Sequence, residues 1–280
     1  MLPDAMYMYP GIKLLHIVNA TTLLFILALG GTSVCFGQET GSYTDHATLV
    51  SLVGEADARS FSDVLDRDHE FEFRVYVPDN YDPAEPPGLL VHVSPVASGE
   101  IPESWKEVFE RRNLIWVSVN KSGNSVPQER RLADARLSPT FIRQNYEINA
   151  QRIYISGMSG GGQVSSMAAP LYPDLFRGGI FVCGVNPWSE QDVDPWLDNP
   201  PEDLETMKKN RYVFVSGTED YKLAATARVY RLYKKAGVES SKLIVVDGMG
   251  HELPDVATFD KALEFLDADS AVFEAPGGSD

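Results

Sequence analysis

Cysteine and positive charge are both scarce in this sequence. Of its 280 residues only two are cysteines, Cys35 and Cys183, so we predict no disulfide framework. Lysine and arginine together number 24 against 40 aspartate and glutamate residues, which gives a formal net charge of −16. A surface of this sign repels nucleic acids and anionic membranes, and no basic patch reverses it. We therefore expect neither as a partner, and we interpret Cys183, in an apolar run, as a small buried hydrophobic residue.

Long hydrophobic runs are also lacking, apart from a short one near the N-terminus. Lys13 precedes the run LLFILAL at 23–29, small residues follow at 30–33, and polar sequence begins at Gln38. This order is typical of a secretory signal peptide, and the run is too short for a confident membrane span. We predict a signal peptide over 1–37, cleaved after Gly37, and a secreted or periplasmic protein. An uncleaved signal anchor and a lipoprotein cysteine at Cys35 are alternatives.

After the signal, apolar runs alternate with amphipathic segments up to residue 268. We expect strands over 71–78, 88–94, 114–120, 151–156, 178–185, 211–217 and 241–248. We expect helices over 102–113, 127–149 (which Pro139 could break), from Ser159 to near Pro173, 221–237 and 256–268. Residues 39–60 are polar and unassigned, and 186–203 form an acidic, aromatic loop. The alternation predicts one α/β domain over 38–268, a mostly parallel sheet with helices on both faces, and a flexible tail over 269–280.

One glycine-rich stretch interrupts this pattern at the end of a predicted strand. Gly157-Met158-Ser159-Gly160-Gly161 fits G-x-S-x-G, between a strand and a helix. Neither G-K-[ST] nor G-x-G-x-x-G is present here, so a phosphate-binding or dinucleotide-binding loop is excluded. A sharp strand-to-helix turn would lift the serine hydroxyl above the sheet, and the Gly160 amide could face a developing oxyanion. An ordinary glycine-rich turn is the alternative.

The surrounding segment, INAQRIYISGMSGGGQVSSMAA at 148–169, resembles the nucleophile segment of α/β-hydrolases. It is especially similar to secreted esterases of the group that contains polyhydroxybutyrate depolymerases and feruloyl or acetyl esterases. The resemblance extends over about residues 71–268. It implies an α/β-hydrolase fold and a serine nucleophile followed in the chain by an acid and then a histidine.

A serine hydroxyl needs a base, and the base needs an orienting acid. His251 is the only histidine after Ser159, and it lies between a predicted strand and the last helix. Asp220 belongs to GTED, which follows a buried strand and is similar to the acid turn of these esterases. A helix N-cap is the other role open to Asp220, and Asp194 and Asp198 are rival acids.

An oxyanion hole needs a second amide, from the loop after the strand at 88–94. The His-Gly usual at this point in the family is replaced by Ser94-Pro95. Proline has no N–H to donate, so Val96 is the expected donor, or Ala97 if the turn is longer.

The spacing of the three catalytic candidates leaves no room for a large lid, so we expect a minimal cap or none. The tryptophans of the acidic loop, Trp188 and Trp196, are candidates for lining an acyl or aromatic-alcohol site, or else they pack over the sheet edge. Three aspartates of the same loop do not match a calcium-binding pattern, and we predict no metal and no cofactor.

Together these features predict a secreted serine hydrolase that cleaves a small or polymeric carboxylic ester through an acyl-enzyme. A serine peptidase of the same fold is one alternative, disfavoured because no second domain is evident to restrict access to peptides. A catalytically silent hydrolase fold that binds a ligand is another, supported only by Ser94-Pro95.

Overall fold

The computed structural model describes residues 39–186 and 203–268. The predictions for the signal peptide at 1–37, the tail at 269–280, Trp188 and Trp196, and the loop aspartates at 192, 194 and 198 lie outside these ranges. Within them, no helix combines the length and the apolar character that crossing a membrane requires.

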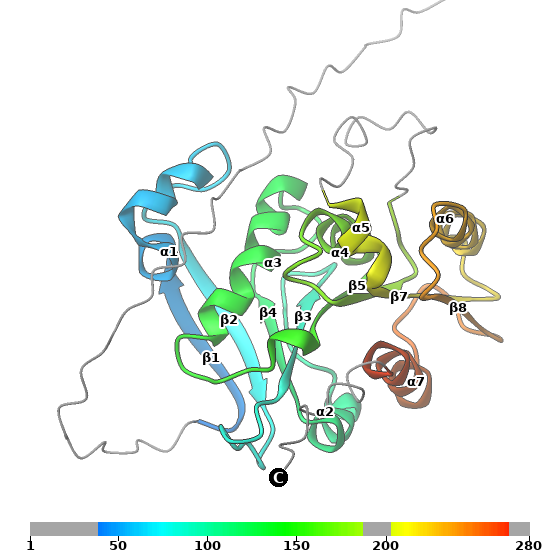
Figure 1. The fold of residues 1–280 in the computed structure, drawn as a ribbon, viewed down its shortest axis with the longest axis horizontal. Helices are drawn as coiled ribbons and strands as arrows, with labels where there is room; N and C mark the ends of the chain where they lie inside the picture. The colour runs from blue at the N-terminus through cyan, green and yellow to red at the C-terminus, as the bar shows by residue number, and fades with distance from the viewer. Residues whose placement is uncertain (1–38, 187–202, 269–280) are drawn as a thin grey trace, which may run out of the picture.

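The core of the protein is one eight-stranded sheet, with the strand order β1-β2-β4-β3-β5-β6-β7-β8 (Figure 1). β1 and β2 pair antiparallel, β2 pairs antiparallel with β4, and every pair from β4 to β8 is parallel. The strands are β1 (Gly41–Thr48), β2 (Glu70–Val77), β3 (Gly88–Val93), β4 (Leu114–Val119), β5 (Ile153–Met158), β6 (Gly178–Val182), β7 (Arg211–Gly217) and β8 (Ser241–Val246).

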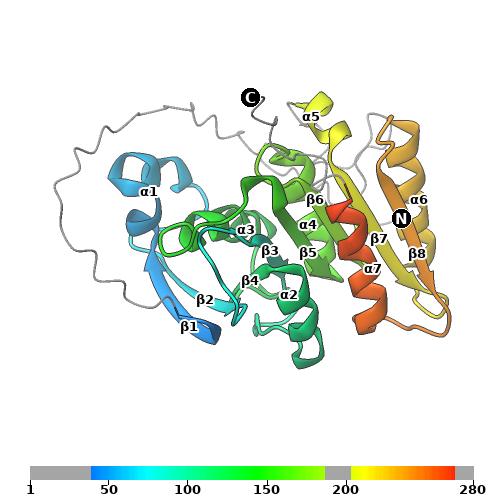
Figure 2. The same ribbon diagram turned by 60° about the horizontal axis from the view of Figure 1, so that its bottom comes forward.

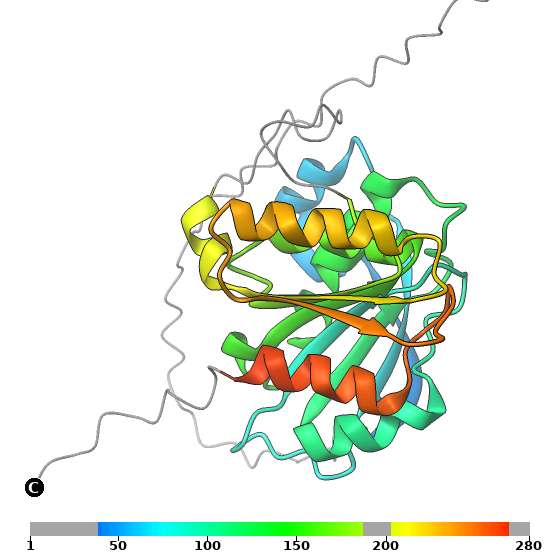
Figure 3. The ribbon, with the colours of Figure 1, turned by 90° about the vertical axis from the view of Figure 1, so that its right-hand side faces the viewer.

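Helices cover both faces of this sheet (Figures 2 and 3). They are α1 (Leu49–Ala58), α2 (Lys106–Arg112), α3 (Gln128–Ile142), α4 (Gly160–Leu171), α5 (Leu204–Lys209), α6 (Leu223–Lys235) and α7 (Val256–Asp267). Residues of α1, α3, α4 and α6 join one hydrophobic cluster, and residues of α2 and α7 join a second on the opposite face. All residues of β3 and β4 are buried, as expected of strands covered on both sides. The mostly parallel α/β-hydrolase architecture predicted from the sequence is confirmed.

Two parts of the fold differ from the sequence-based expectation. The unassigned polar stretch contains β1 and α1: Tyr43 and other alternate residues of β1 are partly buried, and Thr48 caps α1 by accepting from the Ser51 amide at 3.1 Å. Pro139 does not break α3, because the helix continues to Ile142 and the Arg143 amide still bonds the Pro139 carbonyl at 3.1 Å. The expected helix up to residue 149 is therefore too long by about two turns.

Candidate active site

Ser159 occupies the sharp turn between β5 and α4. Its backbone has φ 55° and ψ −119°, a sparsely populated conformation that costs on the order of 1–3 kcal/mol. A Cβ at Gly157 would lie 2.3 Å from the carbonyl oxygen of Gly161, and a Cβ at Gly161 would lie 1.8 Å from that of Val93. Side chains at these two positions are excluded, so the glycines allow the crowded turn that presents the serine hydroxyl.

His251, in the loop between β8 and α7, reaches this hydroxyl. Its Nε2 lies 2.8 Å from Ser159 Oγ, and its Nδ1 lies 2.8 Å from Asp220 Oδ1. With Asp220 ionised, the Nδ1–H donates to the carboxylate, and Nε2 is left to accept from the serine hydroxyl. The structure thus joins the three residues in one hydrogen-bonded chain, from elements far apart in the sequence.

Asp220 lies in the turn between β7 and α6 and is buried. Its carboxylate accepts from Ser216 Oγ at 2.5 Å and from the Lys222 amide at 3.0 Å, in addition to the imidazole. Burial alone would raise the pKa of Asp220, but the bonds from Ser216, His251 and Lys222 outweigh it and lower the pKa below its usual value. The carboxylate is therefore ionised at neutral pH. It orders the turn before α6 and orients the imidazole, whereas the adjacent Glu219 is exposed.

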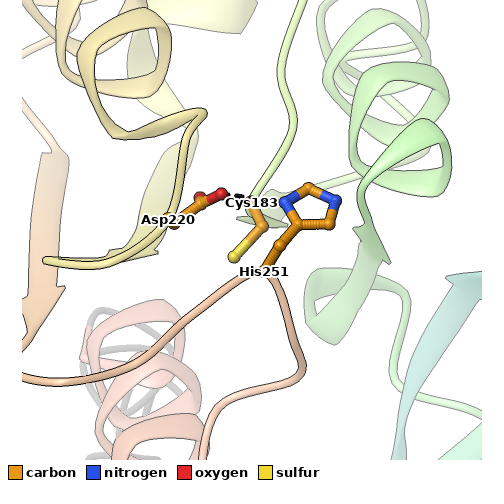
Figure 4. Close-up of side chains that lie close together, drawn as sticks. All are labelled: Cys183, Asp220 and His251. Atoms are coloured by element: carbon orange, nitrogen blue, oxygen red, sulfur yellow. Dashed lines mark hydrogen bonds and ion pairs between the residues drawn. The ribbon is translucent and has the colours of Figure 1, made fainter.

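Cys183, predicted to be only a buried hydrophobic residue, is buried at the site itself (Figure 4). Its sulfur, the Asp220 carboxylate and a His251 ring nitrogen lie within 4.8 Å of one another, and the thiol donates to the Glu252 carbonyl at 3.5 Å. Burial and the neighbouring carboxylate raise the pKa of the thiol to about 12. A neutral thiol is a poor metal ligand and a poor nucleophile, and the other two groups already bond each other. The arrangement favours Cys183 as a packing residue and hydrogen-bond donor.

The two amides expected to form an oxyanion hole have different surroundings. Gly160 is the first residue of α4, so its N–H has no acceptor within the helix, and the positive end of the helix dipole lies there. The Val96 amide donates to Ser94 Oγ at 3.2 Å. An oxyanion would compete with that hydroxyl for the Val96 N–H, so the Gly160 amide is the better-placed donor of the two.

Arg131, on α3, was not identified from the sequence, yet it connects the loops around the serine. Its guanidinium is buried and donates to the carbonyls of Ser94 (2.9 Å), Ser122 (3.0 Å) and Gly160 (3.3 Å), and to Asn124 Oδ1 (3.3 Å). These acceptors belong to the loop after β3, the loop after β4 and the start of α4. No sequence signal marks this residue, because arginine is usually exposed and Arg130 beside it looks the same.

An eight-stranded, mostly parallel sheet with a serine at a strand-to-helix turn defines the α/β-hydrolase fold. The profile of the prolyl oligopeptidase family matches residues 130–270, about half of the chain. The chain therefore belongs to the prolyl oligopeptidase family, whose members are serine hydrolases. No curated protein matches the sequence.

Solved structures similar to this chain include esterases and peptidases. Est1E from Butyrivibrio proteoclasticus is 13% identical with a TM-score of 0.56, over 75% of this chain and 98% of its own. A ferulic acid esterase is 18% identical with a TM-score of 0.58, over 84% of this chain and 100% of its own. A putative dipeptidyl aminopeptidase IV from Bacteroides ovatus is 15% identical with a TM-score of 0.52, over 80% of this chain but only 36% of its own. At these identities the likeness shows the fold alone.

Proposed function

We propose that this protein is a serine esterase, which hydrolyses carboxylic esters through an acyl-enzyme. The observation that carries the proposal is the hydrogen-bonded chain Ser159–His251–Asp220, with both links at 2.8 Å and the serine in a strained turn. A nucleophile, a base in contact with it, and an acid that orients the base are the three parts that acyl transfer requires.

In the proposed reaction, Ser159 Oγ attacks the ester carbonyl carbon while His251 Nε2 takes the hydroxyl proton. Asp220 stabilises the imidazolium that forms, and the Gly160 amide donates to the oxyanion. When the tetrahedral intermediate collapses, the C–O bond to the alcohol breaks and Nε2 returns the proton to the departing oxygen. Water, deprotonated by the same nitrogen, then attacks the acyl-enzyme, and the carboxylic acid and free Ser159 are regenerated.

A peptidase that uses the same three residues is the second candidate, because the prolyl oligopeptidase family includes peptidases. The chain shares its fold with this class of peptidase as well as with esterases such as Est1E and the ferulic acid esterase.

Initial rates on two substrate classes separate these candidates. The wild type should hydrolyse p-nitrophenyl acetate or butyrate and leave dipeptidyl p-nitroanilides intact, and Ser159→Ala should lose the ester activity. Ser62→Ala, an exposed serine near α1, is the matched control and should keep it. Equal ester hydrolysis by the wild type and Ser159→Ala would refute the proposal, and turnover of the anilide alone would identify a peptidase.

A further inference from the structure

Exposed hydrophobic side chains gather around the candidate site. Among the described residues, four large hydrophobic side chains are exposed: Val96, Tyr221, Val245 and Leu253. Three of these are in the loops that form the site, since Val96 follows β3, Tyr221 follows Asp220, and Leu253 is two residues beyond His251. Tyr221 is the most exposed of them, at 73%. A lone exposed hydrophobic residue is ordinary, but this one contacts a reacting group.

Tyr221 lies directly against His251. The two ring centroids are 4.5 Å apart with an angle of 33° between the ring planes, and Tyr221 Oη is 3.3 Å from Nε2. That nitrogen is also the one that lies 2.8 Å from Ser159 Oγ. Two hydroxyl groups therefore approach the same nitrogen, although the reaction derived above uses only the serine.

The second hydroxyl lies beside the nitrogen that the departing alcohol has to approach. Nε2 can return its proton only to an oxygen within hydrogen-bonding reach of it, about 3 Å. Tyr221 Oη is itself 3.3 Å from that nitrogen, so an oxygen that approaches Nε2 from the side of Tyr221 comes within reach of the phenol. A phenol O–H there can donate to the oxygen while negative charge develops on it.

We propose that Tyr221 is a further catalytic residue that acts on the leaving alcohol. As the bond between the acyl carbon and the alcohol oxygen breaks, the proton on that oxygen comes from His251, and Tyr221 donates a hydrogen bond to it and keeps its own proton. The exposed ring lies beside the carbon part of the alcohol. This inference rests on the proposed esterase function.

The dependence of rate on the leaving group tests this role. Nitrophenolate is a stable anion that leaves without help, whereas an alkoxide needs both a proton and a hydrogen bond. Tyr221→Phe should lower kcat/KM for ethyl butyrate about tenfold, the worth of one good hydrogen bond, and for p-nitrophenyl butyrate less than about twofold. Because kcat/KM reports acylation, the shared deacylation step does not enter the comparison.

Tyr81→Phe is the matched control, since it also removes one phenol oxygen. That oxygen accepts from the Glu147 amide at 2.9 Å, and Tyr81 precedes β3, at the opposite end of the sheet from the site. This variant should leave both rates unchanged. Equal losses on both esters in Tyr221→Phe, or no loss on either, would overturn the role of Tyr221 while leaving the esterase function in place. Hydrolysis of neither ester by the wild type would overturn both proposals.

Discussion

Mild acid should weaken the fold through a deeply buried histidine, His92. This residue is in β3, just before the loop that carries Val96, and is only 7% exposed. Its Nδ1 is 2.9 Å from Ser156 Oγ, and its ring stacks on Trp116 with centroids 4.5 Å apart. Burial lowers the pKa of His92 from 6.5 to about 3, so the imidazole stays neutral in the folded protein through the mildly acidic range.

The direction and size of the effect follow from proton linkage. The unfolded chain protonates His92 near pH 6.5 and the folded protein does not, so this contribution to stability is complete above pH 6.5 and is lost as the pH falls from there toward 3. Between pH 7.5 and pH 5 the loss from this residue is about 2 kcal/mol in the free energy of unfolding. This figure depends only on the pKa of His92 in the unfolded chain, because its pKa in the folded protein lies well below 5.

Urea unfolding of the wild type and of the double variant His92→Phe/Ser156→Ala isolates this contribution. The two residues face each other across β3 and β5, so the double change removes both hydrogen-bonding partners and keeps an aromatic ring on Trp116. Other titrating groups affect both proteins alike. Between pH 7.5 and pH 5 the variant should lose about 2 kcal/mol less than the wild type, and parallel pH dependences in the two proteins would refute the reasoning.

Three further substitutions probe Asp220, Arg131 and Asp134, a buried residue of α3 that accepts from Ser122 Oγ. Asp220→Asn leaves the imidazolium without its counter-charge and should lower kcat/KM on p-nitrophenyl butyrate about a thousandfold; a loss below about tenfold would contradict the role of Asp220. Arg131→Met removes the donor to the carbonyls of Ser94, Ser122 and Gly160 and should lower the free energy of unfolding, measured with urea, by about 3–5 kcal/mol; an unchanged urea midpoint would contradict that role. Burial raises the pKa of Asp134 to about 6, so the folded protein binds a proton on this carboxyl more tightly than the unfolded chain does. The stability that this difference contributes is lost as the pH rises through 6. From pH 4 to pH 7 the free energy of unfolding of the wild type should fall by about 2 kcal/mol more than that of Asp134→Asn. The same pH dependence in the two proteins would contradict this expectation.

Local patterns predict the parallel part of the sheet well. The apolar runs that became β3, β4 and β7 are bounded by turn residues, and the period of the helices between them is clear. The order of serine, acid and histidine along the chain selects three residues that lie within hydrogen-bonding distance in the structure. In contrast, β1 escapes prediction because an edge strand that is half exposed reads as polar sequence.

The features that the sequence does not reveal depend on contacts between distant segments. Arg131 is buried because two loops and the start of α4 direct carbonyls at it, and Cys183 adjoins Asp220 because β6 and β7 are neighbours. The direction of the Val96 amide depends on how the Ser94 hydroxyl folds back on the turn. Tyr221 follows Asp220 in the chain, and the sequence does not show that the loop of His251 brings the imidazole against the Tyr221 ring.

The most direct test of the central claim is covalent trapping of Ser159. A fluorophosphonate reacts with a serine hydroxyl that an adjacent base activates, so the wild type should gain one phosphonyl group by intact mass. Peptide mapping should place that group on Ser159, and Ser159→Ala should stay unmodified. A wild type that gains no mass, or an adduct that maps to another residue, would contradict the account.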